Sequence, residues 1–314
     1  MQSIKTGGRH DLASRIGVAL CWIASILVAA VCVFIIGYLL QQGWHSLSWK
    51  FLSTDPVQSL TEDQAGGIRT PMVGTAILVL ASILLALPLA LGAAIYLAEY
   101  MDERRWITRI VRVGLETLAS VPSVVFGMFG LALFTLGAFK FLSSGGAQGS
   151  SMSYGRSFLV ASIVMGIHIL PFVIKVSEEA IRNIPRSLRQ GALALGMTKW
   201  RTIWKVVLPA ARPGLATAAV LGMGLAAGDT AIVWLTLGGS MTMGVDAWWQ
   251  PHNWLAVLKG AGSTLTTYAY FNSPAGDGNS PGAAFGAAFV LMCIVLLFNL
   301  GAVLLFRRRD LTGR

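Results

Sequence analysis

Long runs of apolar residues dominate the hydrophobic pattern of this chain. An apolar segment of about 18 residues or more with almost no charge predicts a membrane-spanning helix, because a hydrocarbon layer of about 30 Å takes about 20 residues at 1.5 Å each. Six segments meet this criterion: 16–40, 72–98, 117–139, 157–174, 213–237 and 283–306. The pattern predicts an all-α polytopic membrane protein with six transmembrane helices.

The first apolar segment is long for a secretion signal. Segment 16–40 carries no charged residue along its whole length, whereas the apolar region of a signal peptide has only about 7 to 15 residues. The residues that follow it, from Gln41 to Trp44, offer no small-residue cleavage site. We therefore expect a retained anchor helix.

The basic residues of the connections predict an orientation. Most of the 24 Lys and Arg residues lie in the two tails and in the connections 99–116 and 175–212. Only five lie in the other connections: Lys50, Arg69, Lys140, Arg156 and Lys259. Because cytoplasmic loops retain positive charge, we expect both termini in the cytoplasm and the large connections 41–71 and 239–282 outside.

Composition excludes several classes of protein. Hydrophobic residues make up 55% of the chain and charged residues 12%, against about 25% charged in soluble domains. The net charge of +10 lies between apolar runs, so membrane topology explains it better than nucleic-acid binding. The chain has no Walker A lysine, catalytic triad, paired-carboxylate cleft or zinc pattern, so we expect no ATP hydrolysis, bound metal or cofactor in this chain itself.

The basic connection 175–212 carries clear helix punctuation. Asn183 is a candidate N-cap, Pro185 suits a first helical turn, and Gly196 suits a left-handed C-terminal position. The helix between them exposes small residues, which let another protein approach the backbone closely. We therefore expect a short amphipathic helix in the cytoplasm.

A second helical segment follows in the same connection. Thr198 is a candidate cap for it, and its apolar positions form one stripe: Trp200, Ile203, Trp204 and Val207. Pro209 and Pro213 are expected to bend the chain into the fifth span.

The spacing within this connection resembles a known family. Gln190-Gly191-Ala192, three residues, Gly196, nine residues and Val206-Val207-Leu208-Pro209 are similar to the "EAA, x3, G, x9, I-x-L-P" loop of permease subunits of binding-protein-dependent ABC importers. Here Gln190 stands where the family has glutamate.

Further motifs resemble the PstA-type permeases of phosphate importers, which have a MetI-like fold. These motifs are 94–100 (AIYLAEY), 121–127 (VPSVVFG), 170–174 (LPFVI) running into Glu178-Glu179-Ala180-Ile181, and 268–278 before the last span. Leu225 occupies the position of an arginine found in many PstA chains, and Gly228-Asp229-Thr230 that of a Gly-Glu-Thr. Another oxyanion, such as sulfate or molybdate, therefore remains open as the substrate.

The resemblance implies a division of the chain and a set of partners. Residues 1–67 would form a cytoplasmic tail, the anchor helix and an external loop; residues 68–306 the permease domain with a coupling loop at 178–209; and 307–314 a basic cytoplasmic tail. It implies a bacterial inner-membrane complex with a second, PstC-like permease, two copies of a PstB-like P-loop ATPase that bind ATP and Mg²⁺, and a periplasmic or lipid-anchored PstS-like phosphate-binding protein. Membrane lipid surrounds such a permease, and nucleic acid is not a partner. The residues expected to couple to the ATPase are Glu179, Ala180, Pro185, Gln190, Gly191, Ala192, Gly196, Leu208 and Pro209.

Ionisable residues at membrane depth are costly and are therefore candidates for the translocation pathway. Glu116 either pairs with Arg112 or takes part in transport, and His168 either donates to a carbonyl left unpaired by Pro171 or lines the pathway. Asp229 is expected to be protonated, to pair with a basic residue on another subunit, to gate the pathway or to form a structural hydrogen bond. Its neighbours Gly228 and Thr230 belong to the same candidate site, and the glycines around it allow close packing either within the chain or against a second subunit.

A different class of transporter remains as an alternative. An ion-coupled secondary transporter would use Asp229 and Glu116 as coupling carboxylates, and it predicts inverted repeats and broken helices near the midplane. The sequence shows no internal repeat, and this alternative leaves the EAA-like connection unexplained.

Overall fold

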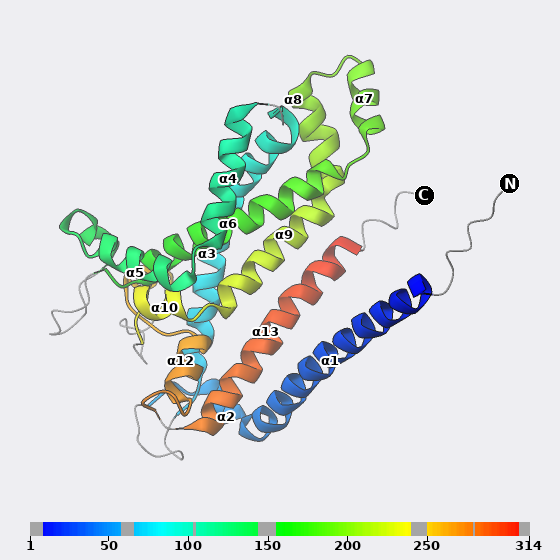
Figure 1. Ribbon diagram of the computed structural model, residues 1–314. Helices are drawn as coiled ribbons and strands as arrows, with labels where there is room; N and C mark the ends of the chain where they lie inside the picture. Colours follow the sequence, from blue (N-terminus) through cyan, green and yellow to red (C-terminus); the bar gives the residue numbers. More distant parts are fainter. Residues whose placement is uncertain are drawn as a thin grey trace.

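A computed structural model of the chain describes residues 9–57, 66–102, 105–143, 155–239, 250–278 and 280–307. These residues are almost entirely helical, with one isolated bridge between Pro56 and Gly66. The long helices, which run roughly side by side in Figure 1, are α1 (Arg9–Ser46), α3 (Arg69–Ile95), α6 (Phe158–Arg182), α9 (Leu208–Gly228) and α13 (Pro281–Arg307). The shorter helices are α2 (Trp49–Ser53), α4 (Trp106–Ser120), α5 (Ser123–Phe134), α7 (Arg186–Ala194), α8 (Lys199–Thr202), α10 (Ala231–Thr236), α11 (Trp254–Lys259) and α12 (Leu265–Asn272). Two π-helical turns, η2 (Tyr96–Tyr100) and η4 (Ile203–Val207), and two 3₁₀ turns, η3 (Gly137–Leu142) and η5 (Pro251–Asn253), complete the described part.

The predicted all-α membrane architecture is confirmed. Within the described residues, five helical segments are long and apolar enough to span a membrane, and counting the bent pair formed by α4 and α5 as one span gives up to six. Helix α6 is central, because it packs against α3, α9, α10, α4 and α5. Its fully buried side chains Phe158, Met165 and Ile169 belong to the main apolar core.

Helix α1 stands apart from this core. It packs along α13, and most of its apolar side chains are exposed (Figure 1). The two helices come closest at Gly43, where a Cβ atom would lie 2.5 Å from the Cβ of Phe289. Only a glycine permits this contact, and the exposed apolar length is consistent with an anchor helix surrounded by lipid.

The third predicted span is wrong as a continuous helix. It breaks at Val121 and Pro122, and α4 and α5 meet there at an angle of 94°. Val121 adopts an extended conformation, because the proline ring disfavours the helical conformation of the residue before it. The predicted span also included Phe139, whereas α5 already ends at Phe134.

The fifth predicted span also contains a break. Helix α9 ends at Gly228, Asp229 is extended with φ −76° and ψ 124°, and α10 begins at Ala231. Pro209 and Pro213 do not interrupt the helix, which is continuous from Lys199 to Gly228. The wider turn η4, in which the Leu208 N–H donates to the Ile203 carbonyl, lies directly before Pro209 and accommodates it.

The segment 239–282 is not an extended loop throughout. Helix α12 folds back onto α3 and α13, and its buried Tyr268 joins Phe51, Ile68 and Phe289 in a second apolar cluster. Thr75 of α3 anchors it, because the Thr75 hydroxyl accepts a hydrogen bond from the Leu265 N–H at 2.8 Å. This end of the molecule is therefore a small packed cap.

An ion pair joins the beginning of α3 to the segment before it. The Asp55 carboxylate accepts hydrogen bonds from Arg69 and, at 2.7 Å, from the Thr70 hydroxyl. Burial by itself would raise the pKa of Asp55, but the hydrogen bonds from Arg69 and Thr70, together with the Arg69 charge, outweigh it and hold this pKa below its ordinary value of 3.8. The pair therefore stabilises the fold above pH 3.8, and the stabilisation is lost as the pH falls through the lower pKa of the folded state.

We expect Asp55→Asn to lower the thermal stability at neutral pH by a small amount, below about 1 kcal/mol, because both partners are partly exposed. The difference from the wild type should shrink as the pH falls below 4. Thermal unfolding of the purified protein across this pH range measures both effects. Asp277→Asn changes an exposed aspartate in the connection between α12 and α13 and is the matched control. A difference that is independent of pH would contradict the assignment.

Candidate functional site

The expected cytoplasmic helix is present as α7, which lies at one extreme end of the molecule (Figure 1). Pro185 occupies its N-cap, whereas Asn183 caps the C-terminus of α6, so the expected role of Asn183 as an N-cap is wrong. Gly196 has φ +79°, the left-handed conformation expected of it. The Met197 N–H donates to the Ala192 carbonyl at 3.2 Å and closes the turn. Thr198 then caps α8, as expected.

Arg189 attaches α7 to the rest of the molecule. Its guanidinium donates to the Glu99 carboxylate at 2.8 Å, to the Ile181 carbonyl at 2.7 Å and to the Ile184 carbonyl. Lys199 adds a hydrogen bond to the Glu99 carbonyl and lies over the ring of Tyr100. Helix α7 is therefore fixed to the end of η2, which continues from α3.

The expected coupling residues divide into exposed and packed ones. Gln190, Gly191 and Gly196 are exposed, and a Cβ atom added at either glycine would meet nothing within 4 Å. Ala192 is buried, and Ala180 contacts Gly214 of α9. Pro185 and Glu179 are exposed, and the remaining two members, Leu208 and Pro209, are half-buried in the first turn of α9. The outer face of this region is completed by exposed apolar side chains: Leu188, Leu193, Leu195, Trp200 and Trp204.

A second ion-pair cluster joins α4 to α6. The Glu178 side chain, 9% exposed, lies 2.6 Å from Arg112 of α4 and 2.8 Å from Arg182 one turn later on α6. The expected pair between Arg112 and Glu116 is therefore wrong. Glu116 is exposed on α4, and no described basic group forms an ion pair with it. Spacing within one helix suggested a local partner, but α6 packs against α4 and supplies a buried carboxylate.

The break between α9 and α10 brings two of the predicted pathway residues together. The Nε2 atom of His168 on α6 lies 4.0 Å from an Asp229 carboxylate oxygen, and the two side chains are 25% and 12% exposed. The other Asp229 oxygen accepts a hydrogen bond from the Ile232 N–H at 2.8 Å and caps α10. Asp229 therefore forms a structural hydrogen bond and also faces an ionisable partner.

His168 does not donate to a backbone carbonyl as expected. Its Nδ1 atom is buried, and none of the described residues forms a hydrogen bond with it. The ring of Phe126 from α5 packs edge-on against the imidazole at 5.0 Å between centroids. The break at Pro122 positions this contact, because it turns α5 across α6.

The glycines near Asp229 have different surroundings. A Cβ atom at Gly222 would lie 2.7 Å from Val173, so this glycine serves packing within the chain. Gly228 is exposed with no atom within 4 Å of such a Cβ atom, and Thr230 is half-buried. The surface beside Asp229 is therefore open on the Gly228 side.

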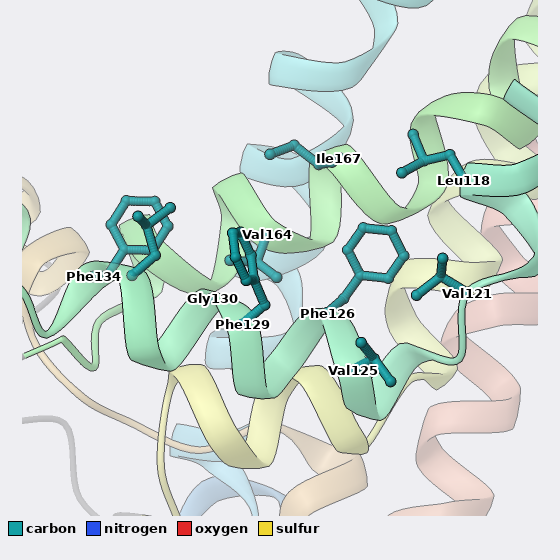
Figure 2. Close-up of a pocket in the computed structure, with 10 residues that line it drawn as sticks. Leu118, Val121, Val125, Phe126, Phe129, Gly130, Phe134, Val164 and Ile167 are labelled. Carbon is teal, nitrogen blue, oxygen red and sulfur yellow. The ribbon is translucent and has the colours of Figure 1, made fainter. Parts of the chain in front are cut away.

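An apolar pocket of about 350 Å³ lies beside the Phe126 ring (Figure 2). Its lining comes from the end of α4, from α5 and from α6: Leu118, Val121, Val125, Phe126, Phe129, Gly130, Leu133, Phe134, Val164 and Ile167. Without a polar side chain it offers nothing that binds an anion. Among the described residues there is also no group of three potential metal ligands.

Comparisons with known proteins agree with this architecture. Residues 87–310 match the family described as "Binding-protein-dependent transport system inner membrane component". The chain is 27% identical over 296 residues to the "Probable ABC transporter permease protein YqgI" of Bacillus subtilis, covering 93% of this chain and 95% of that protein. It is 28% identical over 283 residues to the "Phosphate transport system permease protein PstA 1" of Mycobacterium tuberculosis, covering 90% and 84%. It is 29% identical over 288 residues to the "Phosphate transport system permease protein PstC" of Pasteurella multocida, covering 86% and 81%.

Solved structures resemble the fold. A chain of a bacterial alginate ABC transporter, in complex with its periplasmic protein, matches with a TM-score of 0.59 and 18% identity, covering 96% of this chain and 99% of that one. A chain of the MetNI methionine ABC transporter matches with a TM-score of 0.57 and 18% identity, covering 77% and 94%. At these identities the likeness concerns the fold alone.

Proposed function

Because the chain belongs to the family of inner membrane components of binding-protein-dependent transport systems, and is thus an ABC importer permease, we propose that it imports inorganic phosphate. Phosphate is proposed as the substrate because the chain is similar, over more than four fifths of both chains, to permeases named for phosphate transport. As an inner membrane component it works with an ATPase and a substrate-binding protein. In the proposal these partners are two PstB-like ATPase copies, which bind ATP and Mg²⁺, a PstS-like binding protein and a second, PstC-like permease.

The proposed coupling site is the exposed surface of α7 with Gln190, Gly191 and Gly196. A rigid attachment supports this assignment, because a force on α7 can move the membrane helices only if α7 does not move alone. Arg189 fixes α7 to Glu99 in η2, which directly follows α3, and Glu178 connects α6 to α4 through Arg112. Movement of α7 by the ATPase would therefore be transmitted to α3, α6 and α4.

The proposed pathway passes the break between α9 and α10. The arrangement of Asp229 limits what this carboxylate can do. If ionised, it would repel a phosphate oxyanion at about 5 Å by roughly 3 kcal/mol per unit charge, at an effective dielectric constant near 20. We therefore assign to Asp229 and His168 a role in gating rather than direct binding of the anion. Gly228 and Thr230 would border this gate, and the exposed Glu116 remains a pathway candidate at the end of α4.

The proposed orientation follows the distribution of basic residues. The α7 end of the molecule, with Arg112, Arg182 and Arg189, faces the cytoplasm, and both termini lie on that side. The cap formed by α2 and α12 faces the outside and would receive the binding protein.

ATP-driven uptake by the reconstituted complex tests the substrate. We expect labelled phosphate to accumulate in proteoliposomes only with ATP, and excess unlabelled phosphate to compete at least tenfold more effectively than sulfate or molybdate. Effective competition by sulfate or molybdate alone would identify another oxyanion. Uptake that persists without ATP and depends on an ion gradient would instead favour a secondary transporter, for which the two helix breaks are the only structural argument.

A further inference from the structure

A polar groove of about 430 Å³ lies between α7 and the end of η2. Three arginines line it, Arg182, Arg186 and Arg189, together with Gln190 and the single carboxylate of Glu99. The groove therefore carries an excess of positive charge. Helix α7, which borders the groove, lies at one end of the molecule and extends beyond α13 (Figure 1).

Two of the three arginines already have carboxylate partners. Arg189 binds Glu99 and two carbonyls, and Arg182 lies 2.8 Å from Glu178. Arg186 is exposed, and within the described part of the chain no acidic side chain forms an ion pair with it. It is also the first residue of α7, where the helix dipole adds partial positive charge.

Gln190 determines this excess of charge. It follows Arg186 by four residues on α7, and side chains at this spacing lie next to each other on a helix. A glutamate at position 190 would pair with Arg186 and neutralise the groove. Glutamine leaves Arg186 charged, and its own amide group can donate to an incoming anion.

We propose that this groove receives an acidic side chain, aspartate or glutamate, of the partner ATPase, with Arg186 as its principal ligand and Gln190 as a second donor. The inference rests on the proposed docking of the ATPase on α7. An arginine fork binds a carboxylate through two parallel hydrogen bonds, and charge complementarity of this kind determines register and partner choice. The lipid headgroup is the less favoured occupant, because α7, which borders the groove, extends beyond the ends of the membrane helices α1 and α13 (Figure 1).

The substitutions Arg186→Gln and Gln190→Glu test whether the ATPase side chain in the groove is negatively charged. In detergent free of anionic lipid, the affinity of the purified permease for the ATPase of its own transport system is measured. We expect Arg186→Gln and Gln190→Glu each to weaken binding about tenfold, the size of one charge-assisted contact. Arg109→Gln removes an exposed arginine of α4 outside the groove and should leave binding unchanged. Added salt should weaken wild-type binding more than that of Arg186→Gln.

Other results overturn the inference in distinguishable ways. Tighter binding by Gln190→Glu would mean that the ATPase presents a basic side chain to the groove. If the wild type binds and both variants bind equally well, association with the ATPase and the proposed function stand but the acidic partner of the groove does not. If the wild-type permease does not bind the ATPase, the proposed function fails as well. If Arg186→Gln changes only the response to phosphatidylglycerol in nanodiscs, the groove binds lipid.

Discussion

Replacing Gly196 by valine is expected to abolish association with the ATPase and ATP-driven uptake while leaving membrane insertion intact. Gly196 has φ +79°, and nothing lies within 4 Å of a Cβ atom placed there. The cost of a side chain is therefore backbone strain rather than collision. A left-handed conformation costs ordinary residues roughly 1–2 kcal/mol, and it is a genuine outlier for a β-branched one.

The chain can relieve this backbone strain by opening the turn that follows α7. The turn from Ala192 to Met197 is held by two backbone hydrogen bonds, from the Gly196 N–H to the Leu193 carbonyl at 3.0 Å and from the Met197 N–H to the Ala192 carbonyl at 3.2 Å, and it sets the direction in which the chain leaves α7 for α8. Valine would open this turn and misplace the exposed surface of α7, whereas α7 is not part of a candidate membrane span, so insertion should be unaffected. Co-purification with the ATPase and uptake by proteoliposomes measure the loss.

Gly196→Asn is the matched control. Asparagine tolerates the left-handed conformation far better than valine, so this variant should bind the ATPase to nearly the same extent as the wild type. Because both variants add a side chain to the same exposed position, they differ mainly in the strain. If valine and asparagine behave alike, the conformation of Gly196 is not what the ATPase requires.

Replacing Asp229 by asparagine is expected to lower ATP-driven phosphate uptake at least tenfold without weakening association with the ATPase. Asparagine has nearly the shape of aspartate and keeps the oxygen that accepts from the Ile232 N–H, so α10 remains capped. What it removes is the negative charge that faces His168 at 4.0 Å. A gate that depends on this charge should fail although the fold is intact.

Two further variants separate the charge from the cap. Asp229→Ala removes both and should also lose stability, by about 1 kcal/mol, as expected for a lost helix cap. Asp229→Glu restores the acid with one more methylene and should recover part of the uptake. Asparagine with wild-type uptake, together with a defective alanine variant, would reduce Asp229 to a structural residue. Thermal unfolding of each variant separates lost transport from lost fold.

The sequence predicted the long helices and the connecting helix well, because each rests on local physics. An apolar segment of sufficient length needs no particular partner to be a span, and the helix signals at Gly196 and Thr198 act within a few residues. The same reasoning failed at Asn183, whose side chain is compatible with either end of a helix. It ends α6 because α6 extends eight residues beyond the predicted span, to Arg182.

The sequence identified some of the ionisable side chains as candidates but not their partners. Their cost inside a membrane identified His168 and Asp229 as candidates, but nothing in their spacing placed them 4.0 Å apart. Glu99, Glu178 and Arg189 were missed as a connection between α7 and the membrane helices. Glu99 of the AIYLAEY motif and Glu178, four residues after the LPFVI motif, were visible, yet their partners lie up to 90 residues away in the chain.

The sequence by itself therefore determined an all-α membrane permease with a short helix in the connection 175–212, because hydrophobic length and helix capping are properties of short segments. Only the tertiary structure decided that α4 and α5 meet at 94°, that the chain breaks at Asp229 opposite His168, and that no acidic side chain among the described residues pairs with Arg186. These features depend on which helices pack against α6 and α7, and packing between distant segments has no signature at any one position of the chain.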